Sequence, residues 1–147
     1  MMKWLAISVV LSASVAAGAQ ASDVTAEQMF SKHVSRDDSA GIANTMMRCS
    51  GLLAAMAKEF ESVHKGLYDQ AVISAGTAQN AALAIYSSIG RDYDQDTITG
   101  WTVDWAHHYQ GRFEENMLTD GEKFGSDELI KADLQFCNAV TQSLRES

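Results

Sequence analysis

The chain has 147 residues, and its 11 Lys and Arg against 19 Asp and Glu give a formal net charge of −8. This length fits a single domain of ordinary size, and an acidic surface repels phosphate backbones, so we expect no nucleic-acid partner. There is no proline, although average usage of about 5% would give about seven. The composition therefore favours helices joined by short loops.

Residues 1–21 have the three parts of a secretory signal peptide. Lys3 supplies a positive charge, the segment 4–17 is a short apolar run, and Ala19-Gln20-Ala21 is a small-x-small cleavage site. We therefore expect cleavage before Ser22, and a periplasmic or secreted location.

Residues 22–147 are expected to form a single helical domain. No second apolar stretch approaches the roughly 20 residues that cross a bilayer, so we expect no membrane contact after cleavage. Near its start, Thr25 and Gln28 fit a capping box, which predicts a short helix or a loosely docked arm over residues 22–38.

The strongest periodic signal lies between residues 40 and 64. Seven apolar side chains recur there at alternating spacings of four and three, which predicts one buried helical stripe. They are Ile42, Met46, Cys49, Leu53, Met56, Phe60 and Val63. Arg48 falls outside this stripe.

Three further helices follow. One is predicted from about residue 67 to 89, where Gly90 closes it. The next spans about residues 97–118, with Asp96 as its capping residue. The last begins after the capping residue Ser126 and continues to near the C-terminus. The predicted fold is all-α, a four-helix up-down bundle with a short N-terminal helix or arm.

Cys49 and Cys137 are the two cysteines, and both lie on apolar stripes. In an up-down bundle the first and last helices are antiparallel neighbours, and the two cysteines then lie at nearly the same height. In an exported protein this favours a Cys49–Cys137 disulfide over two buried thiols.

The acidic segment before the third long helix is a weak candidate for a metal site. Asp92, Asp94 and Asp96 match positions 1, 3 and 5 of a calcium hand. Positions 6 and 12, which need Gly and Glu, are Thr97 and Val103. The alternative, which the mismatches favour, is a solvated loop that caps a helix.

The helix at 97–118 is the strongest candidate for a binding surface. It combines aromatic, acidic, imidazole and guanidinium side chains at helical spacing, and such residues are frequent interface anchors. The candidate surface consists of Trp101, Asp104, Trp105, His107, His108 and Arg112. The competing interpretation is that the tryptophans are core residues with solvated charges around them.

Catalysis has little support in the sequence. There is no Gly-x-Ser-x-Gly motif, no Gly-rich phosphate loop and no acid/base spacing among the carboxylates. A haem- or metal-binding bundle using Met46, Met56 and His108 is the alternative, although a Cys-x-x-Cys-His attachment motif is absent. We expect a non-catalytic protein without a cofactor.

Two segments around the cysteines resemble those of small exported bacterial proteins with two cysteines and a helical body. They are the run from Met46 to Ala55 and the run from Asp133 to Cys137, with an intervening stretch from Tyr109 to Asn116. Such proteins are mostly uncharacterised, so the resemblance implies a fold and no activity.

Periplasmic immunity proteins have a similar size and helical body, although some carry additional cysteines. Together with the charge, this favours a binding or interaction protein with a basic protein partner, and an immunity-like inhibitor is its most concrete form.

Overall fold

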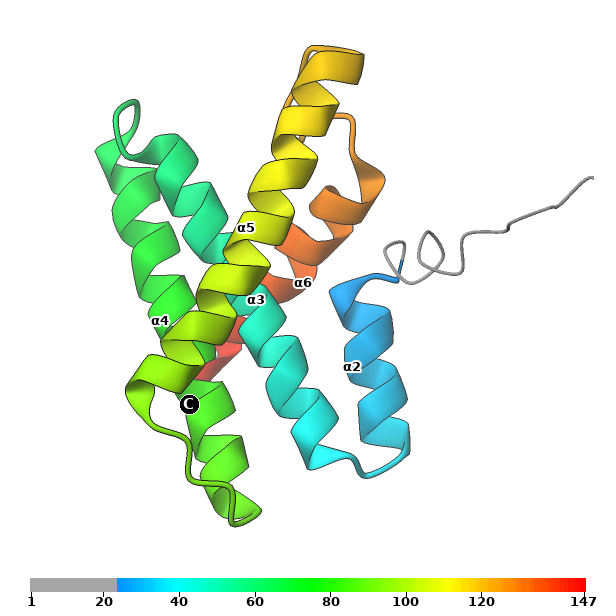
Figure 1. Cartoon of the computed structure of the whole chain (residues 1–147), viewed down its shortest axis with the longest axis vertical. Coiled ribbons are helices and arrows are strands. Elements are labelled where there is room, and N and C mark those ends of the chain that lie inside the picture. Colours follow the sequence, from blue (N-terminus) through cyan, green and yellow to red (C-terminus); the bar gives the residue numbers. More distant parts are fainter. Residues whose placement is uncertain (1–23) are drawn as a thin grey trace, which may run out of the picture.

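The computed structural model describes residues 24–147, and residues 1–23, which include the expected signal peptide, lie outside the described part. The described residues form five helices and no strand (Figure 1). The helices are α2 (Ala26–Ser35), α3 (Ser39–Phe60), α4 (Lys65–Ser88), α5 (Gln95–Asp120) and α6 (Glu128–Glu146). The all-α prediction is confirmed, and each predicted long helix is present within a few residues of its expected bounds.

Side-chain caps define where the helices begin. Thr25 and Gln28 form the predicted capping box of α2. The other two predicted caps were off by one or two residues. Asp94, not Asp96, accepts a hydrogen bond from the Thr97 amide at 2.7 Å and caps α5. Asp127, not Ser126, caps α6.

Helix α3 is the central element of the fold. It packs against α2, α4, α5 and α6, and Figure 1 shows the long α5 crossing it obliquely. Because it is surrounded, α3 is buried over most of its surface rather than along one stripe, and only Asn44 and Lys58 are exposed along its length. Val63, the last residue of the predicted stripe, is 73% exposed because the helix ends at Phe60. Arg48, which lies outside the predicted stripe, is buried as well and is only 5% exposed.

The predicted disulfide joins α3 to α6. Cys49 and Cys137 are bonded, their Cα atoms lie 5.3 Å apart, and both residues are fully buried. The bridge closes a sequence separation of 88 residues. It therefore fixes the last helix against the central one.

Helices α3 and α5 cross at Gly51. A Cβ atom built on Gly51 would lie 2.2 Å from the Cβ of Trp105 and 2.8 Å from the backbone nitrogen of Ala106. The missing side chain therefore permits the close approach of the two helices. The crossing lies between two apolar clusters, and Trp105 packs against both.

Within the described part of the chain, no helix is both long and apolar enough to cross a membrane.

Candidate functional site

A buried network of charged and polar side chains lies under the centre of α5. Arg48 of α3 donates from Nη2 to Oδ2 of Asp133 at 2.6 Å and from Nε to the hydroxyl of Tyr109 at 2.7 Å. The Tyr109 hydroxyl donates to the same Asp133 oxygen at 2.5 Å. The network therefore connects α3, α5 and α6 through one carboxylate.

The second carboxylate oxygen of Asp133 completes the network. It accepts a hydrogen bond from the Ala26 amide, the first residue of α2, at 2.7 Å. A negative charge at a helix N-terminus is favourable. Asp133 thus connects four helices, and no buried side-chain nitrogen or oxygen among residues 24–147 is left without a partner.

Burial and pairing set the protonation states of this network. Burial raises the pKa of Tyr109 well above its usual value, so the phenol remains protonated and available to donate. Burial alone would lower the pKa of Arg48, but the neighbouring Tyr109 and Asp133 outweigh it and raise this pKa. The site therefore holds a fixed ion pair with a neutral phenol between its partners.

The network supports an open recess where α5 meets α3 and α4. The Arg48 guanidinium carbon lies 5.5 Å from the centre of the Trp105 ring, within cation–π range. The recess has a volume of about 350 Å³. Its walls come from α3, α4 and α5 and consist of Asn44, Tyr86, Trp101, Asp104, Trp105 and His108.

One wall of the recess is a cluster of three aromatic rings. Tyr86, Tyr93 and Trp101 meet edge to face, with ring centres 4.9–5.9 Å apart. Each such pair contributes about 0.5–1.5 kcal/mol beyond the area that it buries. The cluster holds Trp101 half-buried, with part of its surface facing the recess.

His108 forms the opposite end of the recess. Its ring contacts Trp105 and Tyr109, each with a centre-to-centre distance of 5.6 Å. Burial, followed by the positive charges of Arg48 and Arg112, lowers the pKa of His108. The imidazole is therefore neutral near pH 7 and available as a hydrogen-bond partner.

Asp104 is the acidic residue of the recess. It is exposed and forms no ion pair with any of the described residues. Its carboxylate therefore lies in a recess lined by Tyr86, Trp101 and Trp105 and has no cationic partner among residues 24–147.

Two members of the predicted surface do not line the recess. His107 is exposed outside it. Arg112 donates from Nε and Nη2 to the two carboxylate oxygens of Asp127 at 2.5 and 3.0 Å. Asn116 donates to the same carboxylate at 2.7 Å. Burial opposes the ionised form of Asp127, but these hydrogen bonds outweigh it and lower its pKa. Arg112 thus fastens α5 to the cap of α6.

The three aspartates of the predicted calcium loop have separate positions. Asp92 accepts a hydrogen bond from the Ser87 hydroxyl, Asp94 caps α5, and Asp96 lies in the first turn of that helix. Among residues 24–147, no group of three or more His, Cys, Asp or Glu side chains is placed to hold a metal ion. The ligands considered for haem are also apart, since Met46 and Met56 belong to different apolar clusters.

Sequence reasoning missed the supporting network and two walls of the recess. Arg48 and Asp133 resemble surface residues until the fold places them together. The available signal was the small residues on several faces of α3, including Gly41, Ser50 and Gly51, which indicate a helix surrounded by neighbours. Such a helix leaves Arg48 no exposed face.

Comparison with known proteins does not assign the site. No family model matches the chain, and neither a curated protein nor a solved structure shows a significant match.

Proposed function

We propose that this protein is an exported, non-catalytic binding protein whose α5 recess receives a cationic side chain of a basic protein partner. An immunity-like inhibitor is the most concrete form of this function. The observation that carries the proposal is the carboxylate of Asp104, which forms no ion pair among residues 24–147 and lines the recess with the half-buried rings of Trp101 and Trp105.

The chemistry of the recess suits a Lys or Arg side chain. Aromatic faces attract cations, with Trp the strongest of the three aromatic side chains. Asp104 supplies a negative charge, and the overall charge of −8 would steer a basic partner toward the protein. The buried network of Arg48, Tyr109 and Asp133 holds the recess in position, so little ordering is needed on binding.

The proposal also includes export from the cytoplasm and an up-down arrangement of the four long helices. The Cys49–Cys137 bond and the signal-like segment 1–21 support a periplasmic or secreted location. The short connections between α3, α4, α5 and α6 support a four-helix up-down arrangement.

A capture experiment with charge-reversed variants tests the proposed function. Protein purified from the periplasm serves as bait in its wild-type form, as Asp104→Arg, and as Glu114→Arg. The last is the matched control, because Glu114 is an exposed residue of α5 outside the recess. We expect a basic protein to be retained by wild type and Glu114→Arg and lost with Asp104→Arg.

Retention by all three baits would refute a role for the recess. Calorimetry with Ca²⁺, Zn²⁺ and Cu²⁺ and a visible spectrum of the same preparation test the alternative function, a metal- or haem-binding bundle.

A further inference from the structure

A second hollow lies on the other side of the central helix, between α4 and α6. It has a volume of about 670 Å³, which is within the range of small-molecule sites. Leu53, Met56 and Phe60 of α3 line its floor, and Leu134 contributes from α6. Leu53 and Met56 are almost fully buried, so this floor is continuous with the core.

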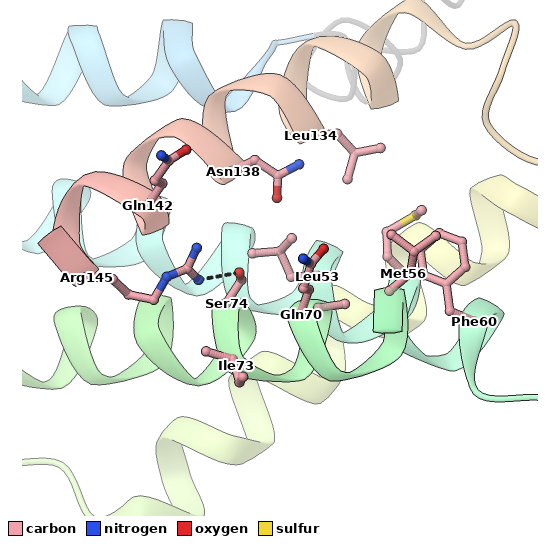
Figure 2. A pocket seen from close by; sticks show the side chains of 12 residues that line it. Leu53, Met56, Phe60, Gln70, Ile73, Ser74, Leu134, Asn138, Gln142 and Arg145 are labelled. Atoms are coloured by element: carbon pink, nitrogen blue, oxygen red, sulfur yellow. Dashed lines mark hydrogen bonds between the residues drawn. The ribbon is translucent and has the colours of Figure 1, made fainter. Parts of the chain in front are cut away.

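The groove has different chemistry at its two ends. Figure 2 shows Met56, Phe60 and Leu134 at one end, and Gln142 and Arg145 at the other. From Leu134 to Arg145 the helix rises about 16 Å at 1.5 Å per residue. The groove therefore has an apolar end and a cationic end separated by the length of a short alkyl chain.

Arg145 is held at the mouth of the groove. Its Nη1 donates to the hydroxyl of Ser74 on α4 at 2.7 Å (Figure 2). No carboxylate of residues 24–147 forms an ion pair with Arg145. A guanidinium has five N–H donors, so several remain to bind an anion after the bond to Ser74.

The rim of the groove exposes apolar surface that an occupant would cover. Leu67 is 39% exposed and Ile73 is 57% exposed, and both line the hollow from α4. Because the groove combines this exposed apolar surface with the guanidinium of Arg145, the covering group needs an apolar body with one negative end.

We propose that this groove binds a single amphipathic monoanion, a free alkyl carboxylate, with its chain over Met56 and Phe60 and its carboxylate on Arg145. The charge complementarity at Arg145 selects an anion over a cation of equal chain length. The groove lies on a different face of α3 from the α5 recess, so the proposal is independent of the proposed protein partner.

Isothermal titration calorimetry tests the ligand class. The probes are sodium decanoate and decyltrimethylammonium bromide, both below their micelle concentrations, titrated into protein purified from the periplasm. We expect saturable one-to-one binding of decanoate and, because the charge-assisted hydrogen bonds are lost, affinity weaker by about tenfold for the cation.

Four variants locate the head group. Arg145→Gln is expected to weaken decanoate binding by about tenfold, whereas Arg145→Lys should retain most of it because the charge remains. Ser74→Ala removes only the anchoring hydroxyl and should have a smaller effect. Arg36→Gln makes the same charge change at an exposed site outside the groove and should have no effect.

Methionine methyl NMR locates the alkyl chain. Decanoate should shift the methyl resonance of Met56, which lines the groove, and leave those of Met46 and Met47 in the other cluster unchanged. Leu134→Trp, which fills the groove, should abolish the shift.

Several results would overturn the proposal. They are absence of decanoate binding, equal affinity for both head groups, or indifference to Arg145→Gln. Co-sedimentation with anionic phospholipid vesicles that Arg145→Gln abolishes would assign the groove to a bilayer surface. A concentration-dependent dimer that Ile73→Glu disrupts would assign it to a second copy of the chain.

Discussion

The two hollows beside α3 are lined by side chains of different chemistry. The α5 recess lies over an ion pair and a phenol and is walled by rings in edge-to-face contact, all with defined partners. The groove between α4 and α6 has a floor of Leu, Met and Phe side chains. Hydrogen bonds and ring contacts fix direction and distance, whereas aliphatic and thioether side chains accept several packings.

Because of this difference, we expect the two hollows to select their ligands in different ways. A recess with fixed walls discriminates by position, so a cation must lie near both Asp104 and the tryptophan rings. A groove with an adaptable floor discriminates by polarity, and Arg145 is its main selective element. Substitutions can separate these two kinds of site.

The largest expected effect follows from Asp133→Asn, which keeps the shape of the side chain and removes its charge. Arg48 would then remain buried without a counter-ion, and loss of one partner of a buried pair costs about 3–5 kcal/mol. Urea unfolding followed by circular dichroism measures the change. Glu115→Gln, at an exposed position of α5, is the control and should be nearly neutral.

The apolar double variant Arg48→Met with Asp133→Leu should recover much of this stability. If stability is not recovered, the network contributes more to the free energy of unfolding than the pairing of its charges.

Removal of the disulfide is expected to have the next largest effect. The double variant Cys49→Ala with Cys137→Ala should lose about 2–5 kcal/mol, because the unfolded chain is no longer cross-linked. Its helical circular dichroism should persist, since the helices retain their apolar contacts. Tryptophan emission should change little, because the bridge joins α3 to α6 and not to α5. A large red shift in emission would show that the recess depends on the bridge.

Gly51→Ala tests the crossing that supports the recess. The new methyl group would meet the backbone of α5, and such overpacking costs about 1–3 kcal/mol. This loss of stability is opposite in sign to the stabilisation of up to about 1 kcal/mol that Ala gives over Gly through its higher helix propensity. Gly111→Ala is the matched control, because a Cβ there meets nothing within 4 Å. Thermal unfolding of both variants should show a lowered midpoint for the first and an unchanged or raised midpoint for the second.

The ion pair of Arg112 and Asp127 should produce a pH-dependent stability. The folded-state pKa of Asp127 is lowered, so its contribution is present above the unfolded pKa near 4 and is lost as the pH falls through the folded value. Arg112→Met should therefore destabilise the protein at pH 6, and the gap from wild type should narrow below about pH 4. A gap that widens in acid would contradict this assignment.

Asp104→Asn should have the smallest effect on stability, within about 0.5 kcal/mol, because the residue is exposed and forms no ion pair with residues 24–147. Its effect on cation binding in the recess should be much larger. Tryptophan fluorescence during titration with an oligolysine peptide provides the measurement, with Glu114→Gln as the matched control. Equal responses of the two variants would indicate nonspecific attraction to an acidic surface.

Much of the fold follows from local patterns. The capping box at Thr25, the glycine after α4 and the apolar spacing in α3 depend on residues within one or two turns of each other. The Cys49–Cys137 pairing also could be predicted, because the positions of both residues along their helices place them at one height.

The polar interior could not be predicted in the same way. Arg48 and Asp133 are 85 residues apart, and neither has a local partner that signals burial. Of the predicted surface, Trp101, Asp104, Trp105 and His108 share one helical face at spacings of three and four, and they do line one recess. Arg112 continues that spacing by sequence but forms its ion pair with Asp127, which only the fold brings near.

The burial of most of α3 also determines where this protein can change during evolution. A substitution at most α3 positions disturbs a neighbouring helix, so nearly the whole length of this helix is constrained by folding alone. Substitutions of Asp104, Arg145 and the other exposed residues at the two hollows would not disturb the packing of a neighbouring helix. Residues of α4, α5 and α6 that line the hollows can therefore change, and ligand preference with them, while the sequence of α3 stays constant. Among descendants of this chain we expect a conserved α3 and variable residues at the two hollows.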